Sequence, residues 1–167
     1  VITVPNIGSG AISTTAGTGV TGAVSIGNTS ADSIVMSGNI YKTGGAVTLT
    51  TTGGTDASDI EIDFTKGAAV FIATSGDNVS LVGGDVSLAD GSHLTIDTNI
   101  ADSGETNGGN ISIAGGIDGS ADENLTLDAH STGTGTITLA NVGQAEHTGL
   151  TASEINTLTA TAGGGIT

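Results

Sequence analysis

Short segments in which apolar and small polar residues alternate recur from one end of the chain to the other. One example is GGNISIAGG at residues 108–116, and variants of it are NVSLVGGDVSLADG, SHLTID, ENLTLDA and TGTITLA. Each has an apolar-x-apolar centre that begins after Asn, Asp, Thr or His and ends at Gly, Ala or Asp. Because two residues is the period of a β-strand, the pattern predicts many short strands separated by turns.

Twelve segments of strand length carry this alternation. They are AVSI (23–26), SIVM (33–36), AVTLT (46–50), DIEIDF (59–64), AVFIA (69–73), NVSL (78–81), DVSL (85–88), HLTI (93–96), NISI (110–113), NLTL (124–127), TITL (136–139) and INTLTATA (155–162). VITVP at the N-terminus also begins as a strand. Residues 147–158 have some helical character, but an isolated helix of this length is marginal in water, so we expect a loop or turn there.

The spacing of the segments favours a parallel β-helix, or β-solenoid, over other all-β folds. Successive apolar centres lie 7 to 17 residues apart, which argues against a coil of fixed hexapeptide or nonapeptide repeats. Rungs of two or three strands with corners of variable length fit this spacing, and three strands would use roughly 25 to 30 residues. We therefore predict an all-β chain with about three short strands per rung.

The scarcity of large side chains agrees with a narrow core. The chain contains no Trp, one Tyr, two Phe and one Met. A β-sandwich would normally have longer strands and aromatic anchors. Strands of three to five residues bury too little surface alone, but stacking at about 4.8 Å places Val on Val and Leu on Leu. The core should therefore consist of Val, Ile, Leu and Ala in thin layers.

Asn or Asp precedes many of the predicted strands, and the residues concerned are Asp59, Asn78, Asp85, Asn110 and Asn124. These side chains bond nearby backbone amides and tolerate left-handed geometry, so we expect them at the corners. Stacked Asn side chains would also form hydrogen-bonded ladders between rungs.

Threonines also occur in pairs one residue apart, at positions 48 and 50, 136 and 138, and 157 and 159. Similar pairs form flat hydroxyl arrays in ice-binding solenoids, where the same face repeats in every coil. The unequal spacing here predicts no such array, and strand propensity accounts for the threonines.

No linker divides the chain, so we predict a single solenoid segment over residues 1–167. Both ends of the sequence lack the polar caps that shield the open edges of a solenoid. We expect the segment to be a slice of a longer structure or a subunit whose ends pair with neighbouring copies.

The charge balance excludes several classes of partner. The formal net charge is −15, with 17 acidic residues against two lysines and no arginine. Nucleic-acid binding needs cationic groups to neutralise phosphates, and an anionic membrane surface would repel the chain. No apolar run approaches the roughly 20 residues of a membrane helix, so we expect no membrane insertion. The acidic surface would instead keep an extracellular protein soluble and attract cations.

A candidate calcium site lies in DGSADEN at residues 118–124, where oxygen-bearing side chains occupy every second position. The candidate ligands are Asp118, Ser120, Asp122 and Asn124. An EF-hand would require Gly in place of Glu123 and Glu in place of Ala129, so that motif fails. A looser oxygen cage that includes Glu123 is the alternative, and a solvated turn is the favoured interpretation.

The remaining polar residues give little sign of catalysis or of another metal. His93, His130 and His147 are far apart, no cysteine is present, and we expect exposed corner positions rather than a zinc site. Carboxylate pairs such as Asp118 with Asp122, or Glu61 with Asp63, have the residue types for acid–base work. Without arginine or aromatic platforms to hold a sugar, we expect neither an enzyme nor a cofactor.

Residues 108–143, GGNISIAGGIDGSADENLTLDAHSTGTGTITLANVG, and 150–167, LTASEINTLTATAGGGIT, are similar to the repetitive passenger regions of large bacterial surface proteins of the filamentous-haemagglutinin and autotransporter type. The match is strongest over the last third of the chain and looser before residue 75. The resemblance implies a right-handed parallel β-helix displayed on the bacterial cell surface, with a role in adhesion or biofilm scaffolding. No catalytic residues carry over from that family.

These observations lead to one expected function and two alternatives. We expect a non-enzymatic structural or adhesive segment of a bacterial extracellular surface protein, acting as a stiff acidic rod or spacer. Its partners would be other rungs of the parent protein, copies of itself, or a host-surface or carbohydrate ligand. The first alternative is a self-assembling extracellular filament subunit joined head to tail through terminal strands. The second is a carbohydrate-active β-helix enzyme, which the residue content disfavours.

Overall fold

The computed structural model describes residues 1–10, 17–29, 31, 33–51, 61–64, 69–100, 107–119, 122–130, 132–143 and 155–167. Within these ranges all regular secondary structure is β-strand. No helix able to cross a membrane occurs among the described residues. The predictions made for Asp59, Ser120, His147 and most of residues 147–158 fall outside them.

Three five-stranded sheets form most of the fold, and every strand pairing within them is parallel. The first sheet contains β1 (Ile2–Val4), β5 (Ile34–Met36), β8 (Glu61–Phe64), β11 (Asp85–Leu88) and β14 (Ile117–Asp118). The second contains β4 (Val24–Gly27), β7 (Val47–Thr50), β10 (Val79–Val82), β13 (Ile111–Ile113) and β16 (Ile137–Leu139). The third contains β6 (Ile40–Thr43), β9 (Ala69–Thr74), β12 (His93–Asp97), β15 (Asn124–Ala129) and β17 (Thr157–Ala162).

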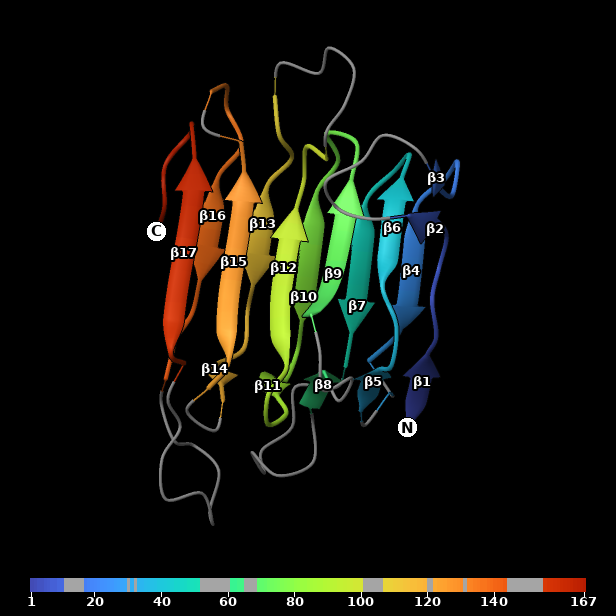
Figure 1. Cartoon of the computed structure of the whole chain (residues 1–167), viewed down its shortest axis with the longest axis vertical. Coiled ribbons are helices and arrows are strands. Elements are labelled where there is room, and N and C mark those ends of the chain that lie inside the picture. The colour runs from blue at the N-terminus through green and yellow to red at the C-terminus, as the bar shows by residue number, and fades with distance from the viewer. Residues whose placement is uncertain are drawn as a thin grey trace.

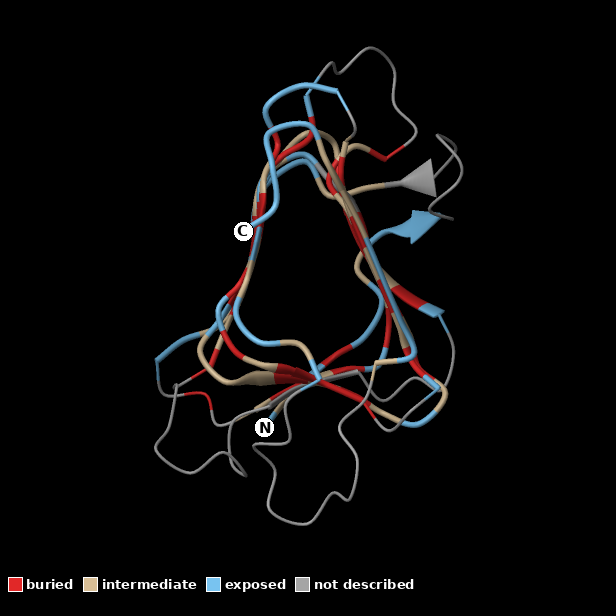
Figure 2. Cartoon of the chain, turned by 90° about the vertical axis from the view of Figure 1, so that its left-hand side faces the viewer, coloured by how far each residue is buried: buried red, intermediate tan, exposed pale blue. Residues whose placement is uncertain are grey.

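From β4 to β15 the chain visits the second, first and third sheets in turn, so each sheet receives every third strand (Figure 1). Seen at right angles to that view, the chain traces a three-sided outline (Figure 2). The exception is an antiparallel pair, β2 (Ser9–Gly10) and β3 (Gly17–Thr18), which stands outside this outline.

The prediction of an all-β chain with parallel sheets is confirmed, and each of the twelve predicted segments contains a strand. The alternation did not predict β2, β3, β6 or β14. The strands β2, β3 and β14 have only two residues each, and in β6 the sequence IYKT does not alternate between apolar and small polar residues.

Loops of different length absorb the irregular spacing, so equivalent positions stay in register. Register partners on neighbouring strands lie 33 residues apart for Leu125 and Leu158 but 23 apart for Val24 and Val47. Gly83 shows how tight these connections are: its φ of +116° is strained for other residues, and a β-carbon there would overlap the Thr51 carbonyl. Most of the variation in length therefore lies in the connections between strands, and one further shift of register occurs within β6, between Ile40 and Thr43.

Hydroxyl residues align in one outward column of the second sheet, but they do not form the flat array of ice-binding solenoids. The register of the second sheet places one hydroxyl residue of each strand in a single outward column: Ser25, Thr48, Ser80, Ser112 and Thr138. A second column beside it does not form at the position of Thr50, because the register partners of Thr50 are Gly27 and Val82, which have no hydroxyl. The face is a single row of hydroxyls and not a two-dimensional array.

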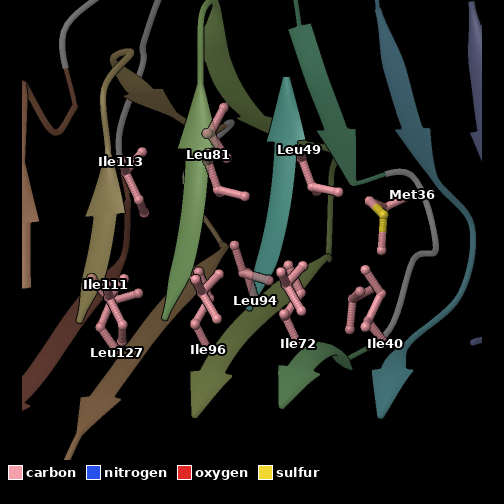
Figure 3. Close-up of a cluster of buried hydrophobic side chains, with 14 of the residues drawn as sticks. Met36, Ile40, Leu49, Ile72, Leu81, Leu94, Ile96, Ile111, Ile113 and Leu127 are labelled. Atoms are coloured by element: carbon pink, nitrogen blue, oxygen red, sulfur yellow. The ribbon is translucent and has the colours of Figure 1, made fainter. Parts of the chain in front are cut away.

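The core is a continuous stack of aliphatic side chains shared by the three sheets (Figure 3). In the third sheet Ile40, Ile72, Ile96 and Leu127 follow one another in register, and all four are completely buried. Each buried side chain of this size stabilises the fold by about 1.5–3 kcal/mol. The predicted stacking of like aliphatic residues is confirmed.

Side-chain ladders link neighbouring strands where the strands begin. Asn78 Oδ1 accepts a hydrogen bond from Asn110 N at 2.7 Å, and Asn110 Oδ1 accepts one from Thr136 N at 3.0 Å. Asp85 Oδ1 accepts from Gly116 N in the same way. The predicted ladders are confirmed, with the difference that these acceptors bond backbone amides of the next strand and not other amide side chains.

The Asn and Asp residues that we expected at corners do not use the left-handed geometry that they tolerate, where the structure describes them. Among the described non-glycine residues only His130 has a positive φ, of 66°. Corners instead use glycine, of which eight described examples have positive φ.

We expect Leu127→Ala to lower the free energy of unfolding by about 2–5 kcal/mol, because it leaves a cavity in the stack. Thr126→Ala, on the outward side of the same strand, should change it by only about 0.5 kcal/mol. Chemical denaturation of the two variants measures this difference. Equal losses would contradict the assigned alternation of inward and outward residues.

Candidate functional site

A concave feature that combines aromatic and amide side chains lies against the outer face of the third sheet. Ile40 and Ile72 point into the core, so their neighbours Tyr41 and Phe71 must face outward. The two rings meet edge to face, with centroids 6.0 Å apart and planes at 75°. Such pairs stabilise by about 0.5–1.5 kcal/mol beyond their burial. The outer face therefore carries an aromatic pair that lies outside the main aliphatic core.

A second, small apolar cluster surrounds this pair. Tyr41, Ala73 and Ile100 are buried together, with Phe71 packed against them. Tyr41 is only 1% exposed even though it lies outside the main stack. Its cover is β2. A β-carbon at Gly10 would overlap the Tyr41 ring, so the bare Gly10 backbone lies directly on the ring. Phe71 is only half-buried and is the more accessible ring.

A groove of about 180 Å³ lies beside the rings, and we call it the aromatic groove. It is lined by Asn6, Gly8, Ser9, Gly10, Asn39, Tyr41 and Phe71. Its lining contains no charged side chain, in a protein whose net charge is −15. The groove is therefore uncharged on an otherwise acidic molecule.

A short amide ladder fixes the polar side of the aromatic groove. Asn6 Oδ1 accepts a hydrogen bond from Asn39 N at 2.8 Å, and Asn39 Oδ1 accepts one from Phe71 N at 3.0 Å. Both acceptor oxygens are thus engaged by the backbone, which sets the orientation of each amide. Each side chain still has an NH2 group with two donors. Within the described part of the chain, neither NH2 group has a hydrogen-bond partner.

The structure does not gather the predicted calcium ligands into an evident cage. Asp118 is buried on β14, Asp122 is exposed, and Ser120 lies outside the described residues. Asn124 Oδ1 already accepts a hydrogen bond from Asn156 Nδ2 at 3.1 Å. No group of three or more acidic or histidine side chains with metal-binding geometry occurs among the described residues. Calcium binding by these four residues stays a prediction.

Glu123, which the looser cage would have used, has a structural position. Its side chain is completely buried, and its two carboxylate oxygens accept hydrogen bonds from Gly91 N and Asp122 N, both at 3.1 Å. The first of these contacts joins residues 32 positions apart. A buried carboxylate needs such partners, so Glu123 ties two neighbouring connections together.

The two described histidines are not the fully exposed corner residues that we expected. His93 is half-buried at the start of β12, and its Nδ1 accepts a hydrogen bond from Asn124 N at 3.0 Å. It therefore belongs to a ladder that Asn124 continues toward Asn156. His130 does lie at a corner, where it is half-buried and its backbone amide bonds Asp128 Oδ1.

The sequence analysis did not predict that Asp97 and Asp128 would lie side by side, because they are far apart in the sequence. Asp97 and Asp128 are register partners on β12 and β15, both half-buried. Each caps its own loop: Asp97 Oδ1 accepts from Asn99 N and Asp128 Oδ1 from His130 N. These carboxylates therefore hold turns. The side chains of Glu61 and Asp63 lie outside the described set.

Comparison of the chain with protein-family models, with curated proteins and with solved structures found no match in any of the three.

The cover over Tyr41 can be tested by adding one methyl group. Gly10→Ala must displace the ring, so acrylamide quenching of tyrosine fluorescence should increase at least twofold. Tyr41 is the single tyrosine and the chain has no tryptophan, so the emission reports on this site alone. Gly22→Ala is the matched control, because a β-carbon there meets no atom within 4 Å. Identical quenching in both variants would contradict the described packing.

Proposed function

We propose that the chain is a right-handed parallel β-solenoid with three strands per turn. In this proposal it serves as a stiff, non-enzymatic, acidic spacer of a bacterial extracellular surface protein, with an adhesive role. The observation that carries the proposal is the register by which every third strand joins the same sheet and adds to one aliphatic stack. The right hand follows from the strong preference of parallel crossovers for that hand.

The contacts between neighbouring strands support the mechanical part of the proposal. In a solenoid each turn contacts only its neighbours, so stiffness depends on what joins successive turns. Here three kinds of link occur together: parallel backbone ladders, amide ladders such as Asn78 to Asn110 to Thr136, and aliphatic stacks. Hydroxyls add a fourth, since Thr98 Oγ1 donates to Asp128 O at 3.2 Å, across 30 residues.

The extracellular and bacterial parts of the proposal are supported by composition and by the family resemblance. A net charge of −15 without arginine favours solubility and disfavours nucleic-acid and anionic-membrane partners. The absence of cysteine is compatible with export.

Pulling the chain by its two ends in optical tweezers tests the spacer function. With handles attached through Val1→Cys and Thr167→Cys, we expect chain release in increments of one turn or whole multiples of it. Register partners on neighbouring strands are 23 to 33 residues apart, which corresponds to about 75–120 Å of extended chain per turn. Gradual extension at low force without discrete transitions would contradict a stiff rod.

A filament subunit is the second candidate, and the exposure of one inward residue favours it. Leu158 on β17 is 44% exposed, although its register partner Leu125 is completely buried. A further strand paired with β17 would cover Leu158, whether that strand came from a longer chain or from a second copy.

Light scattering at increasing concentration distinguishes these two sources of a covering strand. If copies join through β17, the mass should grow with concentration, and Leu158→Glu should abolish the growth by placing a charge in the contact. Thr159→Glu, on the opposite side of the strand, is the matched control. A constant monomer mass would contradict the filament and leave the spacer.

A further inference from the structure

We propose that the aromatic groove binds one neutral hexopyranose ring of a glycan. This inference rests on the adhesive part of the proposed function and gives it a ligand class and a location. The groove lies between the outer face of the third sheet at β6 and β9 and the residues of β2. The pair β2 and β3 stands outside the three-sided outline (Figure 2).

The aromatic residues of the groove are an exception within their own columns. Phe71 pairs in register with Thr95, which pairs with Thr126, and Thr126 pairs with Thr159. Threonine therefore occupies this outward position on three strands of the third sheet, and phenylalanine occupies it on the strand that lines the groove. A half-exposed ring on a polar sheet face leaves apolar surface in contact with water, so a ligand that covers the ring would remove that surface from water.

The lining matches the two kinds of surface that a pyranose presents. A pyranose has apolar C–H faces, which pack favourably on the electron-rich face of an aromatic ring. It also has hydroxyls around its edge, which accept hydrogen bonds from the NH2 groups of Asn6 and Asn39. The exposed Ser9 adds a hydroxyl that both donates and accepts. Mostly apolar walls with a few placed polar groups are typical of small-molecule sites.

The amides are arranged before any ligand arrives. Because Asn6 Oδ1 and Asn39 Oδ1 are held by backbone amides at 2.8 and 3.0 Å, their donors do not have to be ordered on binding. The donor array is therefore continuous with the ladder that joins the strands. The structural role of the two oxygens and the binding role of the two NH2 groups are compatible.

Charge and size restrict the ligand further. No lysine or arginine lines the groove, so uronates, sialylated sugars and phosphates would meet an acidic protein without a compensating cation. No carboxylate lines it either, so it has no ligand set for a metal ion. Its volume of about 180 Å³ is below the roughly 300–1,000 Å³ of pockets for drug-sized molecules. One sugar ring is the appropriate size, and weak, millimolar affinity follows from so few contacts.

The test is saturation-transfer NMR of the whole chain with methyl glucopyranoside, methyl galactopyranoside and N-acetylglucosamine, and with glucuronate as the charged comparison. We expect transfer to the ring C–H protons of at least one neutral sugar. A saturable change in Tyr41 fluorescence with a millimolar midpoint should accompany it. Absence of transfer from all three neutral sugars would overturn the proposal, and so would binding of glucuronate as tight as that of the neutral sugars.

Variants locate the binding. Phe71→Ala and Ser9→Trp should each weaken it at least tenfold, the first by removing the platform and the second by filling the groove from an exposed position. Thr95→Ala, one strand along in the same column, is the matched control and should bind as the wild type does. Phe71→Tyr keeps the ring and should retain binding, which covers the case in which Phe71→Ala fails to fold. Unchanged affinity in Ser9→Trp and in folded Phe71→Ala would overturn the assignment of the site.

The spacer proposal and the glycan-site proposal are overturned by different results. A wild-type chain that unfolds in discrete steps but binds none of the sugars would overturn the glycan site and leave the spacer. A chain that binds a sugar in the groove but extends gradually under force would overturn the spacer and leave the glycan site.

Discussion

The parallel register between neighbouring strands is the constraint on which the rest of the structure depends. A parallel ladder fixes which residue faces the core, since a slip of one position would turn every aliphatic side chain outward. Here the ladder aligns Val47 with Val79 and Leu49 with Leu81, and it does so although the connections differ in length. Aliphatic stacks, amide ladders and the buried Glu123 contact all connect positions that the register brings together. None of them would exist in an isolated strand.

The same register explains how a candidate site can arise on a regular scaffold. Tyr41 and Phe71 are 30 positions apart in the sequence, yet the pairing of Ile40 with Ile72 places them side by side. Asn6 and Asn39 are brought to the same place by a contact across 33 residues. A solenoid with a repeated outer face needs only a local change of side chains, together with one excursion of the backbone, to form a groove. The proposed spacer and the proposed glycan site therefore use one architecture.

Much of the fold could be predicted from local patterns, because alternation is a local property. HLTI at 93–96 has the period of a strand, and β12 is found there. The scarcity of aromatic residues correctly indicated an aliphatic core. Local patterns did not show which group Asn78 would bond, because its partner is the backbone amide of Asn110, 32 residues further along the chain.

The candidate site could not be predicted for the same reason. Tyr41 and Phe71 stand singly in the sequence, and only the register reveals that they are neighbours. The connections differ in length, so that register partners are 23 residues apart on one pair of strands and 33 apart on another. Such variable lengths carry no periodic signal from which the register could be read. The acidic motif at 118–124 attracted attention because its residues are close in sequence, whereas the structure buries Asp118 and Glu123 and leaves Asp122 exposed.

The distance between two spin labels along the hydroxyl column tests the central claim about register most directly. The chain has no cysteine, so Ser25→Cys with Thr138→Cys labels two exposed, outward positions without background. Four strand intervals separate them in the second sheet, which places the two backbones about 19 Å apart. The account predicts a narrow distribution centred near that distance, within the reach of the label side chains. A broad distribution, or one centred at twice that distance, would contradict the register and with it the stack, the ladders and the groove.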